Sequence, residues 1–203
     1  VIPPHANDQG LSLGVIEYLR KTYNQSPFDR SGFPFWQDDE SVSRPSEKTI
    51  KDTAEQLAQG KIVGWYQGHG EIGPRALGNR SILMNPFDPQ GKDWINNKVK
   101  HREPYRPFGA SVLEEKVSRY FYWNGPSPYM LYVTDVLEPE SFPPITHADG
   151  TCRINTVSEE QEDYYMLLQE YEKLTGVPIL LNTSLNNGGK PIAGRVCDAL
   201  ELY

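Results

Sequence analysis

The feature that most constrains the fold is a helical pattern that leads directly into an apolar segment and then a polar loop. Apolar residues recur at helical spacing from Tyr164 to Leu174, and Ser158 with the acidic residues after it suits the start of that helix. Gly176 predicts the helix end, and residues 177–181 predict a buried strand. Helix, short connection, apolar strand and polar loop are typical of an α/β domain, which is the fold class we predict.

The same order of elements occurs earlier in the chain. Ser46 suits the cap of a helix whose apolar residues follow at i, i+4 and i+7, and Gly60 predicts its end. Lys61–Tyr66 then has the aromatic and β-branched composition of a strand. Further strands are predicted at Ser81–Met84, Gly109–Leu113 and Tyr129–Val136, and a further helix at Asp93–Lys100.

The first 45 residues differ from the rest in organisation. Residues 1–24 begin with two prolines and continue as a helical pattern, whereas residues 25–46 are rich in proline and glycine and carry an acidic run. We interpret the helix as a tether and the second stretch as a linker to a compact unit over residues 46–203. The chain starts at Val1 and ends within a helical pattern, so we expect it to be a piece of a longer protein.

Composition excludes several classes of protein. The 203 residues have a formal charge of −7, and 37% of them are hydrophobic and 11% aromatic, which is too apolar for a disordered chain. No segment approaches the ~18 consecutive apolar residues of a transmembrane helix, and we expect neither a signal peptide nor contact with a membrane. The acidic balance argues against a general nucleic-acid binder. Cys152 and Cys197 are interpreted as buried reduced thiols of a cytoplasmic protein.

A loop rich in glycine and arginine follows the predicted strand at residues 61–66. Between Gly68 and Ser81 it contains four glycines together with Arg75 and Arg80. Pro74 suits the first turn of a short helix, whose free amides attract anions, and arginine donates paired hydrogen bonds to phosphate or carboxylate. The alternative is a glycine-rich turn with solvated arginines, and the loop is not a Walker motif.

A second basic segment covers residues 96–108. From Gly68 to Pro107 there are seven basic and four acidic residues, a local charge of +3 within a chain of −7. Such asymmetry indicates an anion site, and a solvated basic patch is the alternative. If Lys100 and Arg102 lie on an extended segment, they share one face, whereas His101 points to the other. Arg106 adds another cation nearby.

Two further polar segments are candidates for the site. Ser184 and Asn186 follow the buried strand and offer neutral hydrogen bonds, although the two glycines after them equally fit a plain turn. His147 and Asp149 raise the possibility of a metal or an acid–base pair, but an Asp-Gly turn explains them as well. We predict no metal site here, and Arg153 is the better candidate for binding.

Several segments in a fixed order resemble the C-terminal part of the NodU/CmcH-type O-carbamoyltransferases. The resemblance covers residues from about Pro3 to the end of the chain. The segments are Glu71–Leu83, Lys100–Glu103, Arg106–Phe108, His147–Thr151 and Leu181–Asn186.

This resemblance implies an open, twisted, mixed YrdC-like sheet with flanking helices in residues 46–203. Residues 1–45 would then be a short remnant of an ASKHA-type domain and the linker. The YrdC-like domain would form carbamoyl-adenylate from carbamoyl phosphate and ATP with Mg²⁺. The acceptor would be a small molecule with a hydroxyl group, and iron or another divalent metal would belong only to the N-terminal domain. By itself, the fragment would not complete the transfer.

The resemblance also assigns roles to residues. YrdC-like domains use a Lys-x-Arg pair with a Ser-x-Asn pair, which implies catalytic roles for Lys100 and Arg102 and substrate binding by Ser184 and Asn186. Further anion contacts are expected from Arg75, Arg80, Arg106 and Arg153. The sequence departs from the family pattern at Lys190, where glutamate is expected, and at Leu185, where phenylalanine is common. Two alternatives remain: a non-catalytic RNA-binding module and a regulatory nucleotide-binding domain.

Overall fold

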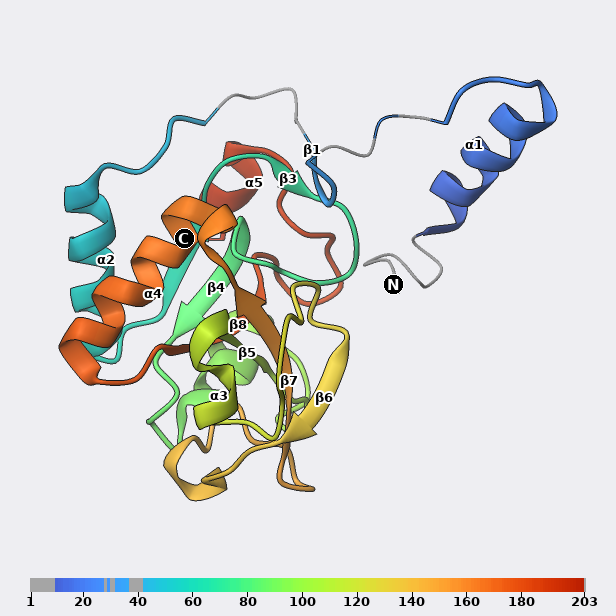
Figure 1. Cartoon of the computed structure of the whole chain (residues 1–203). Helices are drawn as coiled ribbons and strands as arrows, with labels where there is room; N and C mark the ends of the chain where they lie inside the picture. The colour runs from blue at the N-terminus through green and yellow to red at the C-terminus, as the bar shows by residue number, and fades with distance from the viewer. Residues whose placement is uncertain (1–9, 28, 30–31, 37–41, 203) are drawn as a thin grey trace.

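The computed structural model describes residues 10–27, 29, 32–36 and 42–202 (Figure 1). The start of the resemblance at Pro3 and the acidic run at residues 38–40 fall outside these ranges. In chain order the helices are α1 (Leu11–Thr22), α2 (Glu47–Ala58), α3 (Gly91–Trp94), the π-helix η2 (Ile95–Lys100), the 3₁₀ turns η3 (Glu114–Arg119), η4 (Pro139–Ser141) and η5 (Glu159–Gln161), α4 (Glu162–Thr175) and α5 (Val196–Leu200). The strands are β1 (Phe35–Trp36), β2 (Val63–Tyr66), β3 (Gly70–Glu71), β4 (Arg80–Met84), β5 (Gly109–Leu113), β6 (Tyr132–Asp135), β7 (Thr151–Val157) and β8 (Ile179–Ser184).

A mixed sheet forms the centre of the protein. Among the described residues it has six strands in the order β2-β4-β8-β5-β7-β6. Strands β5 and β7 pair in parallel, and the other neighbours in this sheet are antiparallel. A separate two-stranded ribbon pairs β1 with β3, which places part of the predicted linker against the glycine-rich loop. The predicted α/β class with a mixed sheet is confirmed.

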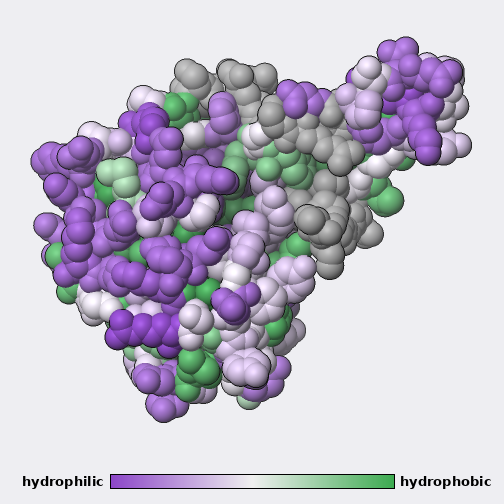
Figure 2. All heavy atoms as spheres, in the orientation of Figure 1, coloured by the Kyte–Doolittle hydropathy of each residue, from purple (hydrophilic) through white to green (hydrophobic). Residues whose placement is uncertain are grey.

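Both faces of the sheet are buried, and each has its own apolar core. Along β8, Ile179 and Leu181 belong to one core and Leu180 to the other, as expected for side chains that alternate across a strand. Helices α2 and α4 cover the second face, and they lie together at the left of Figure 1. The outer surfaces of these two helices are largely hydrophilic (Figure 2). The first core is closed by η2, η3 and the segment before β7.

The predicted helix at Ser46 is confirmed in detail, whereas the predicted start at Ser158 is wrong. The Ser46 hydroxyl accepts a hydrogen bond from the amide of Thr49 at 3.1 Å. Ser158 makes no such cap, because a 3₁₀ turn precedes α4. Gly176 ends α4 with φ of 76°, a left-handed conformation that favours glycine.

The predicted strands are all found: β5 has the predicted bounds, and the ends of the others are shifted. Strand β6 begins at Tyr132 rather than Tyr129, because Met130 has a positive φ of 50° that interrupts the extended backbone. Strand β8 begins two residues later than predicted and continues to Ser184. The later end of β8 follows its pairing with β4, which includes Thr183 and Ser184, and apolar patterns do not report such pairing.

The predicted tether helix exists as α1 and lies apart from the sheet (Figure 1). None of its residues is buried, and Leu11 and Tyr18 are exposed. Of the two cysteines, Cys152 is buried as predicted, whereas Cys197 is exposed, so the prediction is wrong for Cys197. Among the helices that the structure describes, none has both the length and the apolar character needed to span a bilayer.

Candidate functional site

The polar segments singled out in the sequence gather at one edge of the main sheet. The strand register places Gly109 between Asn182 and Arg153 in one row across β8, β5 and β7. Beyond this row lie the end of β8 at Ser184 and the start of β4 at Arg80. The segments are therefore neighbours in space although they come from distant parts of the chain.

Lys100 is a deeply buried cation at this edge of the sheet, and it lines a cleft. It ends η2 and is only 2% exposed. Its Nζ donates to the carbonyl oxygen of Ser184, to Ser184 Oγ at 3.2 Å, to the carbonyl oxygen of Asn186 at 3.0 Å and to Asn186 Oδ1 at 2.7 Å. Ser184 Oγ in turn donates to Asn186 Oδ1 at 2.6 Å. Lys100, Ser184 and Asn186 thus form one hydrogen-bonded unit, which we call the lysine clasp.

Burial gives this ammonium group an unusual acidity. The pKa of Lys100 is lowered to about 7, first by burial and then by the positive charge of Arg102. The oxygen atoms around Nζ favour the charged form, so the group lies near the balance between its two protonation states at neutral pH. An anion that binds beside it would shift that balance toward the ammonium ion.

Two backbone features bring the clasp together. His101 follows η2 with a positive φ of 48°, so residues 100–102 are not extended and the condition for a face shared by Lys100 and Arg102 is not met, although both residues line one cleft. π-Helical turns of this kind occur often at functional sites. The amide of Gly188 donates to the carbonyl oxygen of Lys100 at 3.1 Å, and a side chain at Gly188 would collide with that oxygen. The glycine pair is therefore more than a plain turn, because it lets the two segments meet.

A cleft of about 300 Å³ opens beside the clasp. Arg102 lies in its wall, with Nε donating to Asn96 Oδ1 at 2.7 Å and the guanidinium 4.8 Å from the centre of the Phe108 ring. Arg106 lines the same cleft and is paired with Glu103 at 2.9 Å. The structure therefore brings Lys100, Arg102, Arg106, Ser184 and Asn186 together, as the sequence predicted.

Arg75 and Arg153 form a second cationic group at the same edge, which we call the arginine pair. Both are half-buried, and neither guanidinium has a hydrogen bond or ion pair within the described residues. The pKa of Arg75 is lowered by burial and by the positive charge of Arg153, so the two like charges repel one another. A pair of like charges without an acceptor is suited to an anionic ligand.

Arg80 has a different position from the other predicted anion contacts. It is fully buried, its guanidinium donates to the carbonyl oxygens of Gln67 at 2.5 Å, Asn79 at 3.0 Å and Gly68 at 3.3 Å, and it stacks 3.6 Å from the Tyr66 ring centre. The structure places it inside the loop, not in the cleft. No helix forms at Pro74, so the predicted helix start is wrong, and the loop amides that remain are those of an irregular turn.

The segment around His147 serves the fold. His147 Nδ1 lies 3.2 Å from Thr151 Oγ1, and its Nε2 lies 3.1 Å from the carbonyl oxygen of Phe108. Asp149 Oδ1 accepts from the amide of Thr151 at 3.1 Å, which is the predicted turn before a strand. Within the described ranges, no group of three or more His, Cys, Asp or Glu residues is placed to hold a metal ion.

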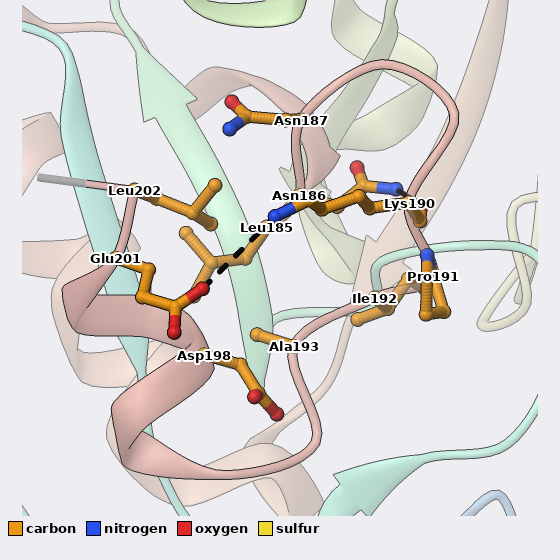
Figure 3. A pocket seen from close by; sticks show the side chains of 10 residues that line it. All are labelled: Leu185, Asn186, Asn187, Lys190, Pro191, Ile192, Ala193, Asp198, Glu201 and Leu202. Atoms are coloured by element: carbon orange, nitrogen blue, oxygen red, sulfur yellow. Dashed lines mark hydrogen bonds and ion pairs between the residues drawn. The ribbon is translucent and has the colours of Figure 1, made fainter.

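The other side of the Ser184–Asn186 loop has the opposite electrostatic character. A small hollow of about 160 Å³ lies there, and Asp198 and Glu201 of the C-terminal segment line it (Figure 3). Lys190, the residue that departs from the family pattern, has its Nζ 4.0 Å from a Glu201 oxygen, and both side chains are exposed. Its charge is therefore directed toward acidic residues and away from the cleft beside Lys100.

Sequence reasoning did not select three residues that organise the site. Asn96 is fully buried, donates to the carbonyl oxygens of Pro104 at 3.2 Å and Arg106 at 3.0 Å, and holds Arg102. Glu71 accepts from two loop amides, and Gly188 permits the contact with Lys100. The available signal for Glu71 and Asn96 was an isolated polar residue inside a candidate segment, which also fits a solvated surface.

With this geometry established, comparison with known proteins assigns the family. The model described as "Carbamoyltransferase C-terminus" matches residues 54–203, so the chain belongs to the carbamoyltransferase C-terminal family. It is 38% identical to the nodulation protein NolNO of Sinorhizobium fredii over 100% of this chain and 33% of that protein. It is 36% identical to the 3'-hydroxymethylcephem-O-carbamoyltransferase of Amycolatopsis lactamdurans, over 100% of this chain and 40% of the relative. The chain thus spans about a third to two fifths of the length of these relatives.

Solved structures show the fold of this family member. Sua5 of P. abyssi, determined in complex with L-threonine, matches with a TM-score of 0.57 and 18% identity over 79% of this chain and 45% of that one. The mixed sheet with flanking helices is therefore YrdC-like, as the resemblance implied.

Proposed function

We propose that this chain is the part of an O-carbamoyltransferase that binds ATP and carbamoyl phosphate and forms carbamoyl-adenylate. The acceptor would be a small molecule with a hydroxyl group, bound in another part of a longer protein. Support comes from the family and from the 3'-hydroxymethylcephem-O-carbamoyltransferases among its relatives. The observation that carries the proposal is the buried Lys100 beside a cleft lined by two arginines.

The reaction needs charge neutralisation more than a protein nucleophile. Water cleaves carbamoyl phosphate into carbamate and phosphate, a carbamate oxygen then attacks the α-phosphorus of ATP, and pyrophosphate leaves. The reactants are all anions, so bringing them together and stabilising the leaving group are the main demands. Mg²⁺ would accompany the triphosphate as its counter-ion.

The two cationic groups offer a division of roles. The lysine clasp with Arg102 and Arg106 would hold one part of the ATP polyphosphate, and the arginine pair would hold another phosphate group of the same ligand. Ser184 and Asn186 keep the Lys100 Nζ at a fixed position in the absence of ligand. This prior ordering lowers the entropic cost of placing a cation against a developing negative charge.

Calorimetric titration with ATP and Mg²⁺ tests the assignment of Lys100. We expect Lys100→Ala to weaken binding at least tenfold, since it removes a charged hydrogen-bond donor. Lys98→Ala is the matched control, because Lys98 is an exposed residue of the same helix. Equal affinity of the wild type and Lys100→Ala would remove Lys100 from the site.

A second measurement separates catalysis from simple binding. Pyrophosphate release in the presence of both ATP and carbamoyl phosphate is expected for the wild type and lost in Arg102→Ala. Binding of ATP without pyrophosphate release would instead favour a regulatory nucleotide-binding domain.

A further inference from the structure

The glycine-rich loop between β3 and β4 is fixed near its C-terminal end and free in its middle. Asn182 donates to the carbonyl oxygen of Ala76 at 3.1 Å, and Gln161 donates to that of Leu77 at 2.9 Å. In the described part of the chain, residues 73–75 take part in no hydrogen bond. The position of Arg75 therefore depends on how the loop is held around it.

Glu71 closes this loop on itself. It lies in β3, and its Oε1 accepts from the amide of Leu77 at 2.7 Å and from the amide of Asn79 at 2.8 Å. One carboxyl oxygen thus joins the first residue of the loop to two residues near its end. Arg80 also donates three hydrogen bonds to the carbonyl oxygens of residues 67, 68 and 79, which hold the two ends of the loop together.

The surroundings of this carboxyl group are largely dry. Burial raises the pKa of Glu71 to about 7, opposed by the amides of Asn79, Leu77 and Arg80 and by the Arg80 charge. The pKa of the Tyr164 phenol is raised first by burial and also by the negative charge of Glu71. A buried carboxyl group is costly, so its presence beside two loop amides indicates a role in positioning the loop.

We propose that Glu71 is a positioning residue that acts through Arg75: by holding the amides of Leu77 and Asn79, it keeps the loop closed around Arg75, whose guanidinium would bind a phosphate group together with Arg153. The Glu71 carboxyl makes no contact with the ligand in this role. The effect of Glu71 on ligand affinity rests on the proposed function, whereas its effect on the loop does not.

Amide hydrogen exchange on the ligand-free protein tests the effect on the loop. Glu71→Ala is expected to lose protection at Leu77 and Asn79 by at least tenfold while the strands β5 and β8 keep theirs. Glu71→Gln retains an acceptor oxygen and is expected to restore protection at both amides. Unchanged exchange in Glu71→Ala, or the same local loss in Glu71→Gln as in Glu71→Ala, would overturn the proposal.

A double-mutant cycle with ATP and Mg²⁺ tests the effect on the ligand. Glu71→Ala and Arg75→Ala are each expected to weaken binding about tenfold, and the double variant is expected to bind no more weakly than Arg75→Ala alone. A merely structural role would not give this non-additivity. Additive losses would show that Glu71 does not act through Arg75. Absence of binding by the wild type would overturn the proposed function, and the exchange experiment would still decide the role of Glu71.

Discussion

The lysine clasp and the arginine pair lie at the same edge of one sheet, yet they satisfy their charge in opposite ways. Lys100 is surrounded by oxygen atoms of Ser184 and Asn186, whereas Arg75 and Arg153 have no acceptor among the described residues. The hydrogen bonds of the Lys100 ammonium group are made within the fold, which holds this cation in place. The second group carries a repulsion that an anion would relieve. The difference predicts that loss of Lys100 destabilises the folded protein, whereas loss of Arg75 weakens mainly ligand binding.

Replacement of Lys100 by methionine gives the largest expected effect. It leaves several buried oxygen atoms without their donor, so we expect the free energy of unfolding to fall by about 3 kcal/mol. Urea denaturation measures this loss, and Lys98→Met, an exposed substitution on the same helix, is expected to change it by less than about 0.5 kcal/mol. If the two variants were equally stable, the clasp would contribute nothing to the fold.

The pH dependence of the free energy of unfolding measures the pKa of the Glu71 carboxyl group in the folded protein. Its pKa in the folded protein is about 7 and its ordinary value is 4.5, so the folded state favours the protonated form. The stability it contributes is fully present below about pH 4.5 and is lost as the pH rises to about 7. We expect a loss of about 2 kcal/mol across this window in the wild type relative to Glu71→Gln, measured by denaturation at a series of pH values. A constant difference between the two proteins would contradict the raised pKa.

The pH dependence of sulfate binding tests the charge state of Lys100 in the lysine clasp. The pKa of Lys100 is about 7, and a bound anion favours its charged form, so binding takes up a proton above that pH. We expect sulfate affinity, followed by calorimetry, to fall as much as tenfold between pH 7 and pH 8. Sulfate itself does not titrate in this range. The dependence should vanish in Lys100→Met, and its persistence there would point to another titrating group.

Replacement of Arg75 gives the smallest expected change in the free energy of unfolding. Unlike the earlier changes, this one is a gain. Arg75→Met relieves the repulsion by Arg153, so we expect the ligand-free protein to gain about 0.5 kcal/mol. Thermal unfolding with and without sulfate measures the effect, because the anion should stabilise the wild type more than the variant. A clear loss of stability without ligand would show that Arg75 has a partner in the fold.

The periodic elements could be predicted because local physics determines them. Ser46 caps its helix through its own hydroxyl, and the apolar segment around Leu180 forms a strand that is buried on both faces. The start of α4 was predicted wrongly, since a serine followed by acidic residues also fits a 3₁₀ turn. Likewise, an extended conformation of residues 100–102 was only considered as a possibility, and the left-handed conformation of His101 was not visible in the sequence.

The residues of the candidate site were recognised as types, but their roles were not separable in the sequence. Arg75 and Arg80 have equivalent local patterns, yet one is half-buried without a partner and the other is fully buried against carbonyl oxygens. Glu71 was counted as an acidic residue in a basic window and as the first residue of a segment that resembles the family, but no role was assigned to it. These distinctions depend on which distant backbone groups lie beside each side chain.

The sequence by itself determined the α/β class, the principal helices and strands, the family resemblance and the set of basic segments, because helical and strand periodicity, capping and motif order are local properties. Only the tertiary structure decided which cations are hydrogen-bonded within the fold and which are open to a ligand. The meeting of Gly188 with Lys100, and the closure of the glycine-rich loop by Glu71, join residues that are close in space only after the sheet has formed. Burial and hydrogen bonding, which set the charge state and availability of each cation, arise from those contacts.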